Sequence, residues 1–295
     1  MDDGYRLPIR RWGDSDGARA VVLAVHGFND YSNAFAALGP VLAEQQILTY
    51  AYDQRGFGSS SQRGLWAGTG RMIVDLHTLL RLLRQRHPGL PMLLIGESMG
   101  GALIIAAKAV PRLADGAILV APAVWSRDQM PAYQRAALWV TTNTVPWLEL
   151  TGDGLDIQPS DNIEMLRGLG ADPLVIKGTR VDALWGVSNL MDRAADAVTK
   201  LQGPLLVLYG EHDEIIPQSA FCRMVEELPD SGLDIDLVLY RDGWHMLTRD
   251  LQGKRVAADI AAWIDDPTPL LPSQEEVQRD AGRLRQFCDS GGVMD

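Results

Sequence analysis

The sequence predicts an α/β protein: a mostly parallel central sheet with helices on both faces and an inserted, mainly helical cap. Three observations support this prediction. Short aliphatic and β-branched runs recur along the chain, amphipathic segments separate several of them, and this alternation stops in one long central stretch. Strand and helix in alternation are typical of a parallel sheet that helices cover on both sides. With 295 residues, 46% of them hydrophobic, the chain can form one large core with one insertion.

The strands are predicted from near-continuous apolar runs, which are typical of strands buried on both faces. Between them, apolar residues at positions 73, 76, 80 and 83 form one helical stripe, and the helix is expected to end at His87-Pro88-Gly89. The expected strands are Leu7 to Trp12, Ala20 to Val25, Ile47 to Tyr52, Met92 to Gly96, Ala117 to Ala121, Leu205 to Tyr209 and Ile235 to Tyr240.

The domain organisation follows from where the alternation fails. In residues 123–200, turn-rich pieces separate helical ones and no clear strand is present, which indicates an inserted helical cap (lid). The α/β core is then expected to comprise residues 1–122 and 201–266. Residues 267–295 are expected to form a charged, helical C-terminal tail.

Four of the eight tryptophans lie in the expected cap. Because buried aromatic residues usually join layers, the first interpretation is that they mainly pack the cap onto the core. The alternative is that some line an apolar substrate channel, with Trp185, Leu184 and Met191 as candidate substrate-binding residues. An apolar cap face could also contact a lipid surface transiently, or a second subunit. The four residues are Trp125, Trp139, Trp147 and Trp185.

Charge and composition favour some partners and locations over others. The formal net charge of −11 disfavours nucleic acid and anionic membrane surfaces. No apolar run reaches the roughly 20 residues that span a bilayer, and the polar opening Met1 to Tyr5 differs from a signal peptide, so a cytoplasmic protein is expected. Because the chain begins almost at its first strand, the alternative is an exported or membrane-associated protein whose signal precedes this sequence.

The two cysteines, Cys222 and Cys288, do not form a disulfide framework or a metal-ligand spacing. Cys222 lies inside an apolar helical stretch, and buried cysteine commonly behaves as a small apolar residue. Two unpaired thiols are therefore expected.

Gly96-Glu97-Ser98-Met99-Gly100 fits the G-x-S-x-G nucleophile elbow. It follows an expected strand and precedes the apolar helical run Ala102 to Ala109. Glycines on both sides permit the strained turn that lifts the serine hydroxyl above a sheet, and the start of a helix favours negative charge there. Ser98 is therefore the predicted nucleophile.

A serine nucleophile needs a base and a carboxylate, which follow it in this fold in the order carboxylate, then histidine. Of the five histidines, His245 alone lies in a loop after the last expected strand, so it is the predicted general base. The loop after the strand ending at Tyr209 contains three acids, and spacing does not choose among them. The shorter Asp213 is preferred to Glu211 and Glu214.

Acyl transfer also needs N–H donors that hold the oxyanion. The backbone amide of Met99, directly after the nucleophile, is one expected donor, and Phe28 in the loop after the strand Ala20 to Val25 is the other. The segment from Asp53 to Ser60 lacks the Lys-Ser/Thr ending of a phosphate-binding loop. Asp53 and Arg55 are therefore expected to form a turn.

With these residues identified, the chain resembles the monoacylglycerol lipase and lysophospholipase-like branch of the α/β-hydrolases, the serine aminopeptidase S33 type. The resemblance implies release of a fatty acid from a monoacylglycerol, a lysophospholipid or a simpler carboxylic ester, with no metal or organic cofactor. It also supports Asp213 as the triad carboxylate and implies a cap that covers the acyl site. The resemblance extends from about Gly4 to about Ile264 and rests on His26-Gly27, the 53–59 segment, Gly96 to Gly101, Asp172-Pro173-Leu174, Gly210 to Pro217 and Trp244-His245.

Other functions share the same triad. A general short-chain carboxylesterase would cleave small esters only, and an acyltransferase or thioesterase would use another acyl acceptor or donor. A binding protein of the same fold that has lost its chemistry is disfavoured, because all triad positions are filled. Halide- and epoxide-directed relatives of the fold carry aspartate at the elbow, and Ser98 argues against them.

Overall fold

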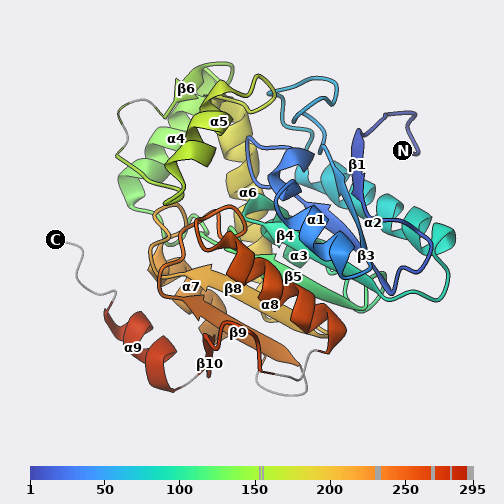
Figure 1. Ribbon diagram of the computed structural model, residues 1–295. Coiled ribbons are helices and arrows are strands. Elements are labelled where there is room, and N and C mark those ends of the chain that lie inside the picture. The colour runs from blue at the N-terminus through green and yellow to red at the C-terminus, as the bar shows by residue number, and fades with distance from the viewer. Residues whose placement is uncertain (153, 155, 230–233, 267–269, 280, 291–295) are drawn as a thin grey trace.

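One eight-stranded sheet forms the centre of the protein (Figure 1). The computed structural model describes residues 1–152, 154, 156–229, 234–266, 270–279 and 281–290. The six central strands lie within a residue of their predicted bounds, and the α/β-hydrolase fold is confirmed. The sheet consists of β1 (Ile9–Trp12), β2 (Ala20–Val25), β3 (Ile47–Tyr52), β4 (Met92–Glu97), β5 (Gly116–Val120), β8 (Leu205–Gly210), β9 (Ile235–Tyr240) and β10 (Glu276–Val277).

The strand order is β1-β3-β2-β4-β5-β8-β9-β10. The six strands from β3 to β9 run parallel, whereas β1 and β10 at the two edges run antiparallel to their neighbours. A parallel sheet needs cover on both faces, and successive side chains of a strand point to opposite faces. In β2, Val21, Leu23 and Val25 join one buried cluster, while Ala20, Val22 and Ala24 join the other.

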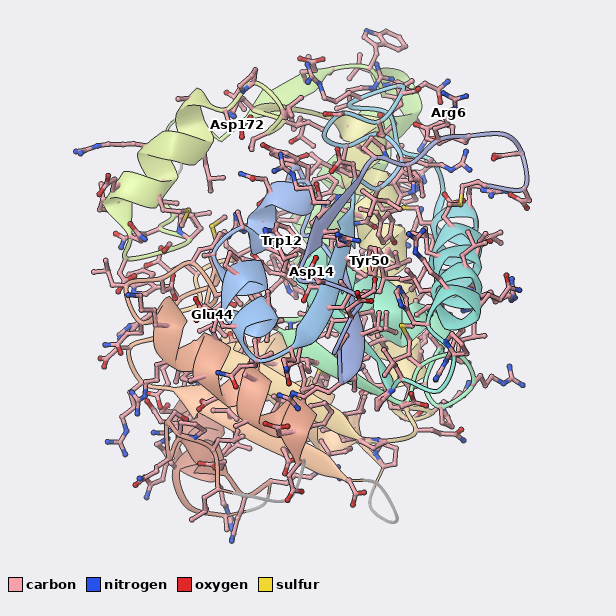
Figure 2. The ribbon with its side chains drawn as sticks, turned by 45° about the vertical axis from the view of Figure 1, so that its right-hand side comes forward. Arg6, Trp12, Asp14, Glu44, Tyr50 and Asp172 are labelled. Atoms are coloured by element: carbon pink, nitrogen blue, oxygen red, sulfur yellow. A yellow bond between two sulfur atoms is a disulfide. The ribbon has the colours of Figure 1, made fainter. Side chains whose placement is uncertain are left out.

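Helices complete both clusters (Figure 1). On one face lie the short 3-10 helix η1 and helices α1 and α8, and on the other lie α2, α3, α6 and α7. At the sheet edge, Trp12 of β1 packs so closely on α1 that a Cβ atom at Gly39 would lie 2.3 Å from its ring (Figure 2). The bounds are η1 (Ser32–Phe35), α1 (Leu38–Glu44), α2 (Thr69–Arg86), α3 (Met99–Ala107), α6 (Val181–Val198), α7 (Gln218–Glu227) and α8 (Gly253–Asp265).

Two short strands occur in the segment predicted to be a mainly helical cap, where the sequence shows no clear strand. β6 (Glu149–Thr151) and β7 (Gly178–Arg180) pair antiparallel, beside α4 (Ala132–Thr144) and α5 (Ile163–Ala171). Strands this short contain too few residues for an alternating pattern to be recognised. At the end of α5, the Asp172 carboxylate accepts a 2.7 Å hydrogen bond from the Tyr31 hydroxyl, which joins this segment to the core (Figure 2).

The interpretation that the cap tryptophans mainly pack the cap onto the core is wrong for two of them. Trp139 is 58% exposed and Trp147 is 63% exposed. Trp139 lies on α4, a helix without any buried residue. Across the described ranges, no helix is both long enough and apolar enough to cross a bilayer.

The C-terminal segment contains a disulfide, so the expectation of two unpaired thiols is also wrong. Helix α9 (Gly282–Ser290) packs on α7 and brings Cys288 to Cys222, with the two Cα atoms 5.6 Å apart. The pairing depends on tertiary packing between residues 66 positions apart, which spacing in the sequence does not indicate. The described part of the tail also supplies β10, the last strand of the sheet.

Candidate active site

Ser98 lies at a sharp turn between β4 and α3. Its backbone has φ 53° and ψ −115°, a strained conformation for a non-glycine residue. Close packing explains the glycines around it: a Cβ atom at Gly96 would lie 2.6 Å from the Gly100 backbone, and one at Gly100 would lie 1.9 Å from the Val25 carbonyl oxygen. The turn has the geometry of a nucleophile elbow.

Two further loops at the carboxyl ends of β8 and β9 bring an acid and a histidine together. A Cβ atom at Gly210 would lie 2.3 Å from the Gly243 carbonyl oxygen, so the two loops can touch only because glycine is present. The amide of His212 donates to the same Gly243 carbonyl over 2.9 Å. These contacts bring His245 close enough for its Nδ1 to donate a 2.8 Å hydrogen bond to Oδ2 of Asp213.

The Asp213 carboxylate is held by the backbone of its own loop. Its Oδ1 accepts hydrogen bonds from the amides of Ile215 and Ile216, at 2.8 and 2.9 Å. Since Oδ1 is used locally, Oδ2 is left to orient the imidazole of His245, and Nε2 of that ring remains free to act as a base. The described residues Ser98 and His245 do not share a hydrogen bond in this structure.

The environment of His245 adjusts its basicity. Burial alone would lower the pKa of the imidazole, but the charge and hydrogen bond of Asp213, together with the charge of Glu97, outweigh burial. The pKa of His245 is therefore raised above its ordinary value of 6.5. A raised pKa makes the histidine a better proton acceptor once it is neutral.

Two backbone amides near Ser98 are available as donors. Met99 begins α3, so its N–H has no carbonyl one turn earlier within the helix. In the part of the chain that the structure describes, neither the Met99 amide nor the Phe28 amide donates a hydrogen bond. The Phe28 loop touches the elbow, because a Cβ atom at Gly27 would lie 3.4 Å from the Ser98 Cβ.

The other four histidines are engaged elsewhere. Nδ1 of His26 bonds the Gly27 carbonyl, and its Nε2 accepts from the Gln54 amide, so neither nitrogen is free. His77 bonds the Ala107 carbonyl, His87 bonds the Tyr50 hydroxyl, and His212 stacks on Trp244.

The 53–60 segment forms a turn, as expected. The Asp53 carboxylate accepts from the backbone amides of Ser32 and Ser59, at 3.0 and 2.8 Å. Arg55 forms a buried ion pair with Asp75 of α2. These contacts fix the loop between β3 and α2.

The three candidate substrate-binding residues lie on α6. Met191 is buried in the core cluster, whereas Leu184 and Trp185 are half-buried. The Arg127 guanidinium lies 4.4 Å from the centre of the Trp185 ring. Their role in substrate binding stays a prediction.

Trp66 contacts the oxyanion loop, and the sequence pattern did not indicate this. Its ring lies against Gly186 of α6, where an added Cβ atom would be only 2.3 Å from the ring. The centres of the Trp66 and Phe28 rings are 6.4 Å apart. It therefore packs between α6 and the loop that carries a candidate oxyanion donor. An isolated tryptophan after Gly64-Leu65 gives no periodic signal in the sequence.

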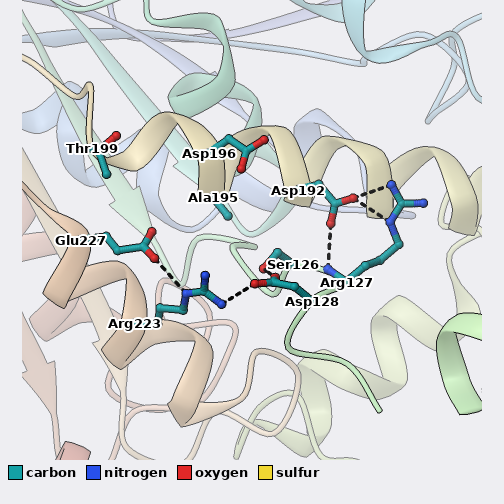
Figure 3. Close-up of a pocket in the computed structure, with 9 residues that line it drawn as sticks. All are labelled: Ser126, Arg127, Asp128, Asp192, Ala195, Asp196, Thr199, Arg223 and Glu227. Atoms are coloured by element: carbon teal, nitrogen blue, oxygen red, sulfur yellow. Dashed lines mark hydrogen bonds and ion pairs between the residues drawn. The ribbon is translucent and has the colours of Figure 1, made fainter. Parts of the chain in front are cut away.

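A cavity of about 620 Å³ lies between α6, α7 and the segment after β5 (Figure 3). Most of its charged groups pair with one another: Arg127 pairs with Asp192, and Arg223 pairs with Asp128 and Glu227. None of the triad candidates lines it. Among the described residues, no group of three or more His, Cys, Asp or Glu side chains is arranged to hold a metal ion.

An α/β-hydrolase fold with a serine at the elbow defines a serine hydrolase of the esterase and lipase class. The chain belongs to the family described as "Serine aminopeptidase, S33", whose family model matches residues 16–252. The resemblance seen in the sequence is therefore confirmed.

Two of the similar proteins are lipases in name. The monoacylglycerol lipase of Mycolicibacterium smegmatis is 27% identical over 267 residues, which cover 88% of this chain and 93% of the relative. The monoglyceride lipase of Homo sapiens is 27% identical over 283 residues, which cover 90% of this chain and 89% of the relative.

Solved structures agree with the fold. The crystal structure of Paleococcus ferrophilus monoacylglycerol lipase has a TM-score of 0.74 at 25% identity and covers 88% of this chain and 98% of that one. A Saccharomyces cerevisiae monoglyceride lipase variant in complex with a substrate analogue has a TM-score of 0.74 at 20% identity. It covers 90% of this chain and 94% of that one, and it supports the fold alone.

Proposed function

We propose that this protein hydrolyses carboxylic esters of fatty acids, with monoacylglycerols and lysophospholipids as the preferred substrates. The observation that carries the proposal is the arrangement of four loops at the carboxyl ends of β2, β4, β8 and β9. The strained Ser98 turn, the backbone amides of Phe28 and Met99, and the Asp213–His245 hydrogen bond all belong to these loops. This set of groups is what a two-step acyl transfer requires.

In the first step, Nε2 of His245 takes the proton from the Ser98 hydroxyl as the oxygen attacks the ester carbonyl. The Phe28 and Met99 amides hold the negative oxygen of the tetrahedral intermediate. The bond to the alcohol then breaks, and His245 returns its proton to the leaving oxygen. In the second step, water gives a proton to His245 as its oxygen attacks the acyl-serine. The bond to the Ser98 oxygen then breaks, His245 returns the proton to that oxygen, and the acid leaves.

Exposed apolar side chains on the cap support a lipid substrate. Those of Trp139, Val140, Trp147, Leu148 and Leu150 are each at least 45% exposed within one continuous stretch of chain. Grouped apolar exposure of this kind marks contact surfaces, and a cap that touches a lipid surface can take substrate directly from it. The names of the relatives favour monoacylglycerol among the possible esters.

We infer an oxidising compartment from the bond between Cys222 and Cys288. Disulfides persist in secreted and periplasmic proteins and are rare in the cytosol of most organisms. This favours the exported alternative over the cytoplasmic expectation. Labelling of free thiols in intact cells of the source organism tests it: unreactive cysteines support export, and two reactive cysteines contradict it.

A substrate panel tests the proposal. We would measure hydrolysis of p-nitrophenyl esters from acetate to palmitate, of 1-monooleoylglycerol and of lysophosphatidylcholine, with the wild type and Ser98→Ala. The wild type should prefer long chains, and the variant should lose about 10⁶-fold in kcat while keeping its circular dichroism spectrum. Near-wild-type cleavage by Ser98→Ala would contradict the assignment of the nucleophile.

The same panel separates the alternatives. Serine-dependent cleavage of short esters only would indicate a general carboxylesterase. Adding a competing alcohol or thiol shows whether the acyl group passes to water, and transfer in preference to hydrolysis would indicate an acyltransferase. Cleavage of acyl thioesters in preference to oxygen esters would indicate a thioesterase.

A further inference from the structure

We propose that Arg249 is a positioning residue that holds the nucleophile loop, the oxyanion loop and the histidine loop in one fixed arrangement. The inference rests on the proposed function, because it concerns the geometry of that site. None of the three residues involved belongs to the triad.

One guanidinium bridges the three loops. Nη2 of Arg249 donates to Oε1 of Glu97 over 2.6 Å, and Nη1 donates to Oδ2 of Asp30 over 2.7 Å. Glu97 directly precedes Ser98, and Asp30 follows Phe28 by two positions. Arg249 itself lies four positions after His245, and its amide donates to the Met246 carbonyl over 2.7 Å, in a tight turn. A movement of any one loop therefore changes the contacts of the other two.

The network is buried. The side chains of Arg249, Asp30 and Glu97 are 7%, 9% and 2% exposed. Among the described residues, Nε of Arg249 and Oε2 of Glu97 have no hydrogen-bond partner. Buried ion pairs seldom stabilise a fold more than apolar residues of the same volume would, and unsatisfied atoms add to their cost. This cost is easier to explain if the network fixes the position of the loops.

The network also sets the charge around His245. Asp213 faces the imidazole from the loop after β8, Glu97 from β4, and Arg249 from the histidine's own loop. Asp250 lies in that loop too, and its carboxylate accepts from the Trp244 amide. Glu97 raises the pKa of His245, whereas Arg249 lowers it. Neutralising one or the other should therefore move the pH profile in opposite directions.

The test compares Arg249→Lys, Arg249→Met and Glu97→Gln with the wild type. Hydrolysis of p-nitrophenyl butyrate is measured from pH 5 to 9, and rates are normalised to the sites that a fluorophosphonate labels at completion. Arg55→Met is the matched control, because Arg55 also forms a buried ion pair, with Asp75, and its hydrogen bonds and ion pairs among the described residues go to Asp75 and Asp3, outside the three loops. Thermal unfolding reports how much each change destabilises the fold.

Arg249→Lys should lower kcat by about 10-fold or more, because an ammonium group cannot bridge two carboxylates as a guanidinium does. Since this variant keeps the positive charge, the acid limb of its pH–rate profile should stay at the wild-type pH. Arg249→Met should lower kcat by about 100-fold, with KM nearly unchanged. The acid limb of its pH–rate profile should move to higher pH, because Arg249 lowers the pKa of His245, and that of Glu97→Gln should move to lower pH, because Glu97 raises it. Arg55→Met should lower only the unfolding temperature.

A wild-type kcat per labelled site in a folded Arg249→Lys would overturn the positioning role. If Arg249→Met does not fold, Arg249→Lys and Glu97→Gln decide the question. A pH–rate profile of Glu97→Gln that coincides with that of the wild type would also contradict the positioning role. A wild type without esterase activity and without labelling at Ser98 would overturn the proposed function, and this inference with it. An active wild type whose variants differ only in unfolding temperature would overturn the inference alone.

Discussion

The hydroxyl of Ser160 donates a 2.6 Å hydrogen bond to Oδ1 of Asp250, across 90 positions of sequence. Ser160 lies in the predicted cap and is fully buried, while Asp250 lies in the loop that carries His245. Next to this contact, the Met246 amide donates to the Pro159 carbonyl over 3.0 Å. The cap is therefore attached directly to the histidine loop, so a shift of the cap would be transmitted to the general base.

The buried carboxyl group of Asp250 should make stability depend on pH. Burial raises the pKa of Asp250 from 3.8 to about 6, although Ser160 and the Trp244 amide lower it in part. Between these two values the folded protein binds a proton that the unfolded chain releases, so this group adds stability as the pH falls. Relative to Asp250→Asn, the wild type should gain about 1 kcal/mol of unfolding free energy from pH 7 to pH 5.

Urea unfolding of both proteins at pH 5, 6 and 7 measures the difference. Asp250→Asn is matched in shape and does not titrate. An equal difference between the two proteins at all three pH values would show that the pKa of Asp250 is not raised.

Asp213→Asn should lower kcat by about 10⁴-fold, because the amide no longer holds the imidazole in the required tautomer. It should also move the acid limb of kcat/KM to lower pH, since the Asp213 charge and hydrogen bond raise the pKa of His245. Glu211→Gln and Glu214→Gln are the matched controls from the same loop. A larger loss in either control than in Asp213→Asn would reassign the triad carboxylate.

Reduction of the Cys222–Cys288 bond should destabilise the fold. Opening a cross-link between residues 66 positions apart increases the chain entropy of the unfolded state. The resulting loss of unfolding free energy should be at most about 4 kcal/mol. Urea unfolding with and without a phosphine reductant measures the loss. The double variant Cys222→Ser/Cys288→Ser should be insensitive to the reductant, and a wild type that is equally insensitive would contradict the bond.

The double variant Trp139→Ser/Trp147→Ser should weaken binding to phosphatidylcholine vesicles by about 10-fold, because two large exposed apolar side chains are removed. Its kcat on soluble p-nitrophenyl butyrate should stay within about twofold of the wild type, because both residues are exposed and neither belongs to the candidate triad. Leu82→Ser, which changes a side chain 51% exposed on α2, is the control. Equal vesicle binding by all three proteins would remove lipid contact from the role of the cap.

Much of the fold could be predicted because burial on both faces leaves a simple pattern. The run from Ala20 to Val25 is apolar at every position, and the structure buries every position. The nucleophile turn could be predicted for a similar reason. Gly96 and Gly100 have no room for a Cβ atom, so the spacing of the motif records a local steric requirement.

The features that the sequence did not reveal depend on contacts between distant segments. Arg249 is 219 positions from Asp30, and a single arginine in a loop is typical of a solvent-exposed position. Cys288 reaches Cys222 only because the terminal helix folds back on α7. In both cases, the partner is chosen by tertiary packing, which leaves no periodic signal in the sequence.

The antiparallel strands at the sheet edges affect how the molecules behave when crowded. β10 has only two residues, and β1 has four, with Arg10 and Arg11 among them. Short edge strands and charged edge residues are two means by which proteins prevent a sheet from pairing with that of a neighbour. Crowded copies of the protein would thus offer one another poor partners for strand pairing from edge to edge.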